Sequence, residues 1–351
     1  MAVRVKQQHD AKRQAGRLLA ALSAAIWMTL LSSSVFAQAG SRPPQFFDTP
    51  QMFYHALNGS APGSQSGLGQ SQPLTPTGVL QLSPETRYLL WVELAQGRLN
   101  VLENLGDAGI VIRKRIPVSI GKQGIGKHTE GDGKTPIGIY RIESFLDDAA
   151  LDDFYGVGAF PLNYPNPLDL IESRTGHGIW LHGLPKQEAQ RPFLASEGCI
   201  VIDNQSLAAL ANEIGAGATL VLSPSELQWA PLGRSQDRLK TLKRAMSGWR
   251  DAWQDRNTPE YLAYYADDFS DLQRDKQEWA AYKARVNADK KYIHVDISDV
   301  SILEEPAEPG LVNVVFKQSY VSDNFRWKGM KQQLWRQGDD GWKIIFEGDY
   351  F

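Results

Sequence analysis

The chain has 351 residues, of which 42% are hydrophobic and 22% are charged, and its formal net charge at pH 7 is −3. These values lie close to average globular usage and exclude collagen-like, coiled-coil and wholly disordered proteins. At about 100 to 200 residues per domain the length predicts two domains. Because the chain beyond its N-terminus has no basic stripe, we expect no nucleic-acid partner.

The first 39 residues are typical of a secretory signal peptide. Five basic residues and one acidic residue occur in positions 1–17, a 14-residue apolar run extends from Leu18 to Leu31, and overlapping small-residue cleavage sites lie within 35–39. The alternative is a membrane anchor, but a spanning helix needs about 20 apolar residues, more than this run offers. We therefore predict a cleaved leader over 1–39 and export to the periplasm.

Residues 40–84 form a segment whose role the sequence does not reveal. Within it, residues 59–78 consist almost entirely of Gly, Ser, Thr, Pro and Gln and carry no charge. Such a composition cannot bury enough apolar surface to fold by itself. The sequence therefore predicts an N-terminal segment and linker over 40–84.

Residues 85–224 have the pattern of short strands. Segments rich in β-branched and aromatic residues alternate with Gly and other turn residues. We predict strands at 88–94, 99–102, 110–120, 137–142, 178–182, 200–202 and 219–222, and one helix at 206–214. The pattern thus indicates a mostly-β domain.

A second linker is predicted over 225–236, where Pro, Gly and Ser recur. Beyond it, apolar residues at intervals of three and four, among them Trp249 and Trp253, predict an amphipathic helix. Long strand-like segments follow the helices. We therefore expect an α+β domain over 237–351.

The chain has one Cys, Cys199, and six scattered His residues. A single Cys cannot form a disulfide within its own chain, so Cys199 is a buried small hydrophobe, an intermolecular bridge or a reactive thiol. No set of Cys and His residues has zinc-site spacing. We therefore expect no metal and no cofactor.

Cys199 and His182 are the residues that point to chemistry. A Cys is a useful nucleophile where a base takes its proton and backbone N–H groups await the oxyanion formed on attack at a carbonyl. His182 ends a predicted strand and is followed by Gly183, and Gly198 precedes Cys199. The alternative is a packed thiol beside an unrelated His, and the adjacent glycines argue against it.

Two sequence blocks resemble the L,D-transpeptidase (YkuD-like) catalytic domain family. The first is a His, a spacer and then [ST]-x-G-C, matched by His182 and Ser196–Cys199. The second, Gly131–Tyr140, is similar to the family's G-D-x-x-T-P-x-G-x-Y. The resemblance covers roughly residues 85–224 and implies a β-rich catalytic domain with Cys199 as nucleophile and His182 as its base.

The resemblance also implies a substrate, the stem peptide of peptidoglycan. Cys199 would cleave it after the third residue, at the meso-diaminopimelate to D-alanine bond, and form a thioester. An amine acceptor would make the enzyme a transpeptidase, and water would make it an L,D-carboxypeptidase that trims tetrapeptides to tripeptides. An alternative of another class is a non-catalytic cell-wall-binding protein, which the retention of Cys199, His182 and Ser196 argues against.

Further roles follow from the resemblance. The N–H groups of Cys199 and Gly198 would form the oxyanion hole. Ser196 would orient His182 or a substrate carbonyl, or alternatively cap a turn. His177 is a second candidate base, but its odd spacing from His182 puts it on the opposite strand face and favours a structural role.

Four residues are assigned to the substrate-binding wall of the cleft: Gly183, Asp132, Thr135 and Glu197. For Asp132 and Thr135 a bracing role is the favoured interpretation. Glu197 departs from the commoner His at that position, and Val201 departs from the commoner Arg or Asn. A carboxylate beside the nucleophile opposes thiolate formation unless it points away or pairs with a cation.

The C-terminal domain resembles the nuclear-transport-factor-2-like (NTF2-like) cone domains. The resemblance rests on Trp249 and Trp253 in the first helix, on Tyr261–Phe269 and on the closing strand Gly341–Phe346. It implies a curved sheet around a pocket whose aromatic residues bind a glycan face or a partner chain. The alternative is that these aromatic residues are simply the core.

Overall fold

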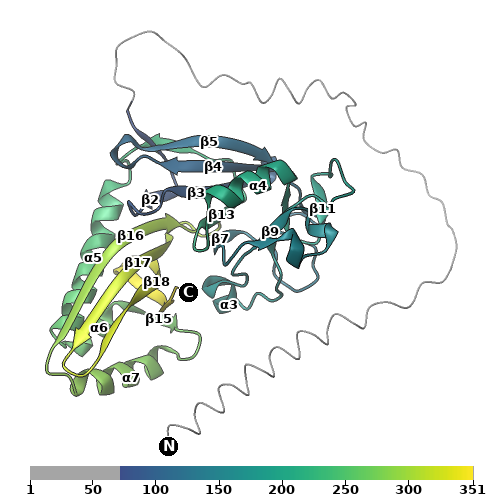
Figure 1. Cartoon of the computed structure of the whole chain (residues 1–351). Coiled ribbons are helices and arrows are strands. Elements are labelled where there is room, and N and C mark those ends of the chain that lie inside the picture. Colours follow the sequence, from purple (N-terminus) through teal and green to yellow (C-terminus); the bar gives the residue numbers. More distant parts are fainter. Residues whose placement is uncertain (1–71, 351) are drawn as a thin grey trace, which may run out of the picture. The chain divides into compact units, whose positions relative to one another are not determined.

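The computed structural model describes residues 72–350, so the predicted signal peptide and most of the first predicted linker lie outside the described residues. Strands dominate the first part of this region, and helices followed by long strands make up the second (Figure 1). No helix among residues 72–350 has the length and apolar character needed to span a membrane.

The first part is built on a five-stranded sheet in the order β5-β4-β3-β13-β7. Its strands are β3 (Tyr88–Glu93), β4 (Arg98–Asn104), β5 (Ile110–Pro117), β7 (Gly138–Arg141) and β13 (Thr219–Ser223). Strands β3 and β13 run parallel, and the other neighbours are antiparallel. Alternate side chains of this sheet, such as Leu90 and Leu222, are buried in the main core of the domain.

A four-stranded sheet in the order β12-β10-β9-β8 carries the residues of chemical interest. Its strands are β8 (Leu146–Asp147), β9 (Gly158–Pro161), β10 (Trp180–Gly183) and β12 (Ile200–Ile202). A small parallel pair, β6 (Ile120–Gly121) and β11 (Leu194–Ser196), lies in the segments that lead to this sheet. Helix α4 (Asn204–Glu213) follows β12 and is capped by the Asp203 carboxylate, which accepts the Ser206 N–H.

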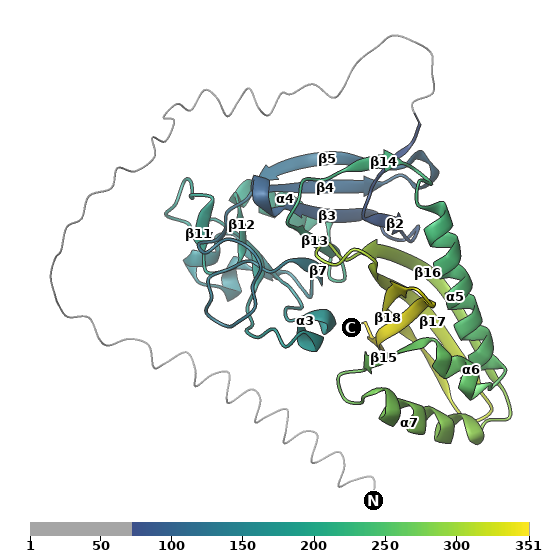
Figure 2. The ribbon, with the colours of Figure 1, turned by 180° about the vertical axis from the view of Figure 1, so that it is seen from behind.

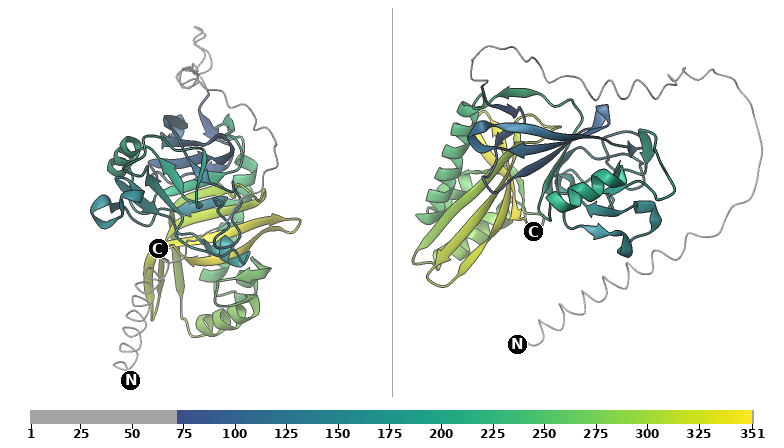
Figure 3. Two further views of the ribbon diagram at one scale, coloured as in Figure 1. Left: turned by 90° about the vertical axis from the view of Figure 1, so that its right-hand side faces the viewer. Right: turned by 45° about the horizontal axis from the view of Figure 1, so that its top comes forward.

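The second part combines three helices with five strands of a six-stranded sheet, whose sixth strand comes from earlier in the chain. The helices are α5 (Gln236–Gln254), α6 (Thr258–Ala263) and α7 (Lys276–Ala288), and the strands are β15 (Tyr265–Ser270), β16 (Ile293–Glu304), β17 (Leu311–Ser322), β18 (Arg326–Gly338) and β19 (Gly341–Asp349). Helix α5 lies along the long strands (Figures 2 and 3). Trp249 and Trp253 of α5 pack with Phe316 of β17 in the core between the helices and the sheet.

Parts of both predicted linkers are strands, which corrects those predictions. β1 (Leu74–Pro76) pairs with β14 (Trp229–Pro231), and β2 (Val79–Gln81) adds to the six-stranded sheet beside β16. The physical reason is that partner strands supply the backbone hydrogen bonds that a Gly- and Pro-rich segment cannot satisfy by itself.

The two parts also share apolar contacts. Val79 of β2 and Leu303 of β16 belong to one buried cluster with Leu89 of β3, and Leu168 packs with Leu311 in another. Residues 237–350 therefore cover apolar surface of residues 72–236. The boundaries at 85–224 and 237–351 remain a proposal about domain organisation.

Candidate active site

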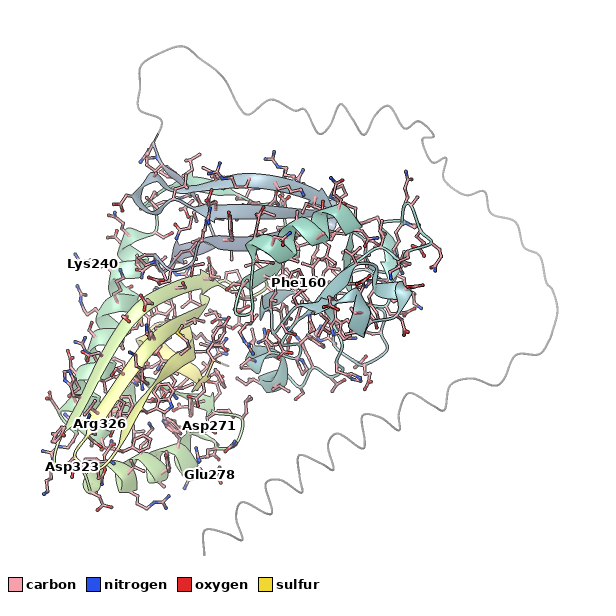
Figure 4. The ribbon with its side chains drawn as sticks, in the orientation of Figure 1. Phe160, Lys240, Asp271, Glu278, Asp323 and Arg326 are labelled. Carbon is pink, nitrogen blue, oxygen red and sulfur yellow. The ribbon has the colours of Figure 1, made fainter. Side chains whose placement is uncertain are left out.

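The alternation of side chains along β10 and β12 places His182 and Cys199 on one face of the four-stranded sheet. Leu181 and Ile200 are opposite each other in the parallel pair, and both point into the main core. Side chains of odd and even positions leave a strand on opposite faces. His182, one position on from Leu181, and Cys199, one position before Ile200, therefore both project away from the core. Phe160 of β9, labelled in Figure 4, is opposite Leu181 and is buried on the core side.

His182 is held as a neutral imidazole whose basic nitrogen is free. The ring is only 1% exposed, and its Nδ1 lies 2.7 Å from the carbonyl oxygen of Gly183. A carbonyl oxygen can only accept, so Nδ1 carries the proton and Nε2 has the lone pair. The buried Nε2 has no hydrogen-bond partner among residues 72–350. This is the tautomer that a general base requires.

Aromatic residues from the segment before β9 cover the imidazole. The Tyr155 and Phe154 rings lie 5.2 and 5.7 Å from the His182 ring, measured between centroids. Burial, and to a lesser extent the positive charge of Arg191, lower the pKa of His182 to about 4. His182 is therefore uncharged at neutral pH.

Cys199 is a half-buried free thiol at the entrance to β12. Its Sγ lies 3.5 Å from the carbonyl oxygen of Gly178, to which the thiol donates. Burial raises the pKa of the Cys199 thiol, whereas the Trp180 N–H and the charges of Arg191 and Lys127 oppose this shift. The resting pair is therefore a neutral thiol and a neutral imidazole, and the thiol must turn from Gly178 to reach His182.

Ser196 caps the turn that carries the nucleophile. Its Oγ accepts the N–H of Gly198 at 3.1 Å and donates to the carbonyl oxygen of Cys199 at 2.6 Å. The turn-capping alternative for Ser196 thus describes its contacts, and it makes no hydrogen bond to His182. Because the Gly198 N–H is taken, the predicted two-donor oxyanion hole is corrected, and the Cys199 N–H is the donor left in this turn.

Thr135 and Gly198 join the two sequence blocks. The buried Thr135 hydroxyl donates to the carbonyl oxygen of Gly198 at 2.9 Å. Gly198 has a φ of +129°, and a Cβ there would lie 2.7 Å from the carbonyl oxygen of Lys134. Glycine is therefore required by the close approach of the second block, and Thr135 braces the nucleophile turn.

Asp132 organises the loop that precedes Thr135. Its carboxylate accepts hydrogen bonds from the Lys127 ammonium at 2.9 Å and from the N–H groups of His128, Thr129 and Lys134. Burial alone would raise the pKa of Asp132, but the Lys127 ammonium and these N–H groups hold it well below its usual range. The contacts of Asp132 within the protein are those of a bracing residue.

The two other assigned positions, Glu197 and Gly183, and the second candidate base His177 have contacts of their own. Glu197 is 72% exposed and pairs with the Lys122 ammonium at 2.6 Å, so its charge points away and is paired. Gly183 supplies the carbonyl that orients His182, and a Cβ on it would collide with the Asn204 side chain. His177 is 81% exposed, and its Nδ1 lies 3.3 Å from the Glu130 carboxylate.

Sequence reasoning missed three residues around the imidazole: Phe154, Tyr155 and Arg191. Burial is the main cause that raises the pKa of Tyr155, whose ring packs against that of His182. No motif marks these loop residues, so no signal in a single sequence would have found them. Among residues 72–350 no cluster of three or more His, Cys, Asp or Glu side chains is arranged to hold a metal ion.

A second candidate site is a cavity of about 760 Å³ in the α+β part. It is lined by residues that include Trp253, Asp271, Trp279, Tyr282, Lys283 and Lys331; Asp271 is labelled in Figure 4. The buried Lys283 ammonium lies 4.3 Å from the Trp279 ring centroid and 4.6 Å from that of Trp253. By contrast, Trp249 and Tyr261 are wholly buried. The aromatic residues thus serve both as core and as cavity wall.

Comparison with known proteins matches each of the two parts of the chain to a domain family. Residues 87–222 match the family model of the L,D-transpeptidase catalytic domain, and residues 241–348 match that of the Cds6 C-terminal NTF2-like domain. Both recognised resemblances, and the fold class of a mostly-β catalytic domain followed by an α+β NTF2-like domain, are confirmed. A search of curated proteins gave no match.

Two solved structures are similar over most of the chain. Bd1075 from Bdellovibrio bacteriovorus is 29% identical, with a TM-score of 0.65 over 79% of this chain and 99% of that one. The helical cell shape determining protein Pgp2 from Campylobacter jejuni is 24% identical, with a TM-score of 0.65 over 80% of this chain and 96% of that one.

Proposed function

We propose that this protein, whose residues 87–222 belong to the L,D-transpeptidase catalytic-domain family and whose residues 241–348 belong to the NTF2-like family, is a peptidoglycan-modifying cysteine enzyme. One observation carries the proposal. The free Nε2 of a neutral His182 is on the same sheet face as the Cys199 thiol. This is the arrangement that general-base activation of a thiol needs.

The proposed reaction begins with a proton transfer. As Sγ of Cys199 attacks the carbonyl carbon of the third stem residue, meso-diaminopimelate, Nε2 of His182 takes the thiol proton. The Cys199 N–H donates to the oxyanion of the tetrahedral intermediate. His182 then returns the proton to the leaving nitrogen, so that D-alanine departs as an amine and the stem remains on Cys199 as a thioester.

The acceptor of the acyl group decides the enzyme class. Transfer to an amine gives an L,D-transpeptidase, which is our first proposal, and hydrolysis gives an L,D-carboxypeptidase. The carboxypeptidase is favoured by one observation: Phe154, Tyr155 and the buried His182 ring crowd the site, and water needs less room than an amine on a second stem.

The test is incubation of the mature protein, without residues 1–39, with sacculi that carry tetrapeptide stems. Mass analysis of the released muropeptides should show new 3-3 cross-links for a transpeptidase or tripeptides alone for a carboxypeptidase. Replacement of Cys199 with Ala should abolish both products and the covalent adduct with a carbapenem. An adduct that survives in Cys199→Ala would contradict the assignment of the nucleophile.

The proposed location is the periplasm, where the substrate lies and to which the N-terminal pattern directs the chain. The second part of the chain is proposed to bind the cell wall, either a glycan or a protein partner. Its cavity presents cations next to aromatic faces, as Lys283 does with Trp253 and Trp279. Such a surface suits sugar rings that carry carboxylates.

A further inference from the structure

Arg191 is a buried cation beside the active site that the reaction above does not use. Its side chain is 10% exposed, and its Nη2 donates to the carbonyl oxygen of Ala195 at 3.0 Å. The guanidinium lies over the Phe154 ring, 5.5 Å from the centroid. Because Phe154 packs in turn against His182, one aromatic ring separates this charge from the base.

The charge of Arg191 lacks a hydrogen-bonded anion. Its Nη1 is enclosed by the protein and has no hydrogen-bond partner among residues 72–350. The carboxylate of Glu188 lies 3.9 Å from Nη1, beyond hydrogen-bond distance, and that side chain is exposed to water. A buried charge without such a partner is costly, so an anion that approaches this site is stabilised.

Arg191 differs in this respect from Lys127, whose charge also lowers the pKa of Cys199. The Lys127 ammonium donates to the Asp132 carboxylate and to the carbonyl oxygen of Thr129, so its charge is compensated. The positive charge of Arg191 lowers the pKa of both Cys199 and His182, in keeping with its contact to the Phe154 ring that packs on His182.

We propose that Arg191 is a specificity-determining residue that selects stem peptides with a free carboxylate one residue beyond the scissile bond. The inference rests on the proposed function. In a tetrapeptide stem, the carboxylate of the terminal D-alanine is only a few atoms from the carbonyl that Cys199 attacks. A stem whose terminal carboxyl is already bound in an amide lacks this charge and is disfavoured.

The first test needs no peptide substrate. Cys199 is alkylated with anionic iodoacetate and with neutral iodoacetamide, and the ratio of the two rates is compared with that of a free-thiol peptide. In the wild-type protein the ratio of the iodoacetate rate to the iodoacetamide rate should exceed that of the free-thiol peptide. Arg191→Gln should lower this ratio about tenfold. Arg191→Lys keeps a positive charge and should retain most of the preference.

Lys186→Gln is the matched control, because Lys186 lies in the same loop and pairs with Asp148 and Asp153 at the surface. It removes one positive charge and should leave the ratio unchanged. A ratio in Arg191→Gln equal to that of the wild type, with the variant shown to be folded by near-ultraviolet circular dichroism, would overturn the proposal.

The second test compares a tetrapeptide with its C-terminal amide. The wild type should cleave the acid at least tenfold more efficiently, and Arg191→Gln should lose this preference through a higher KM for the acid. Equal turnover of acid and amide by the wild type would overturn the proposal. If the wild type cleaves neither peptide while the alkylation ratio still depends on Arg191, the proposed function fails and the anion subsite is supported.

Discussion

The side-chain hydroxyl of Thr135 donates a 2.9 Å hydrogen bond to the carbonyl oxygen of Gly198, the residue that precedes the nucleophile. The same oxygen of Thr135 accepts the Gly121 N–H at 2.9 Å. Thr135 is inaccessible to solvent, so water cannot replace either bond. The shape of the turn before Cys199 therefore depends on a residue from the other sequence block.

Replacement of Thr135 with Val should slow acylation of Cys199 and destabilise the protein by about 1–3 kcal/mol, because the Gly198 carbonyl and the Gly121 N–H lose a buried partner. Urea unfolding and the rate of carbapenem acylation measure the two effects. Thr135→Ser keeps the hydroxyl and should acylate nearly as fast as the wild type. Wild-type kinetics in Thr135→Val would show that the bond does not position the nucleophile.

The acylation rate should fall at acidic pH with a midpoint near pH 4, because His182 becomes protonated there. The base is active only when uncharged, and burial holds its pKa at about 4 instead of the ordinary 6.5. The rate should therefore be nearly constant between pH 5 and 7 and should fall as pH drops through about 4. Stopped-flow acylation by a carbapenem measures this profile, and a limb at pH 6 to 7 would contradict the buried neutral imidazole.

The stability of the protein should fall as pH rises because of Glu305. Burial and the nearby Asp169 carboxylate raise the pKa of this buried acid from 4.5 to about 8. Between these two values the folded state binds a proton that the unfolded state lacks, so its contribution is full below pH 4.5 and is lost by about pH 8.

Glu305→Gln removes the titration and should flatten this slope, with the variant more stable than the wild type at pH 8 by up to a few kcal/mol. Glu304→Gln is the neighbouring control, which keeps the buried acid in place. Parallel stability curves for wild type and Glu305→Gln, measured by urea unfolding from pH 5 to pH 9, would rule out the buried protonated acid.

Lys283→Gln should slow turnover of intact sacculi several-fold and leave acylation by a small carbapenem unchanged, because the cavity can contact only the large substrate. Burial lowers the pKa of Lys283 to about 8, so binding of sacculi should also weaken as pH rises through 8 and the ammonium loses its charge. Lys276→Gln is the control on the same helix, since Lys276 pairs with Asp267 at the surface. Full activity of Lys283→Gln on sacculi would argue against a binding role for the cavity.

Local patterns in the sequence were enough to predict the mostly-β and α+β parts and to single out Cys199 and His182. The period of a strand can be read from a few neighbouring residues, and each of the two sequence motifs lies within a short segment. Both can therefore be recognised without knowledge of distant contacts. The period of a strand fixes how side chains alternate along β10 and β12, and the parallel pairing of the two strands in the folded protein then puts His182 and Cys199 on one face.

Only the tertiary structure decided how the remaining residues act, because their roles depend on contacts between distant segments. Thr135 meets Gly198 across 63 positions, and β2 finds its partner in β16, from a segment whose composition indicates a linker. Ser196 had two open roles until its hydrogen-bond partners were known. Arg191 has no pattern around it in the sequence, and its importance arises from burial beside Phe154 without a bonded anion, which is a property of packing and of the local dielectric environment.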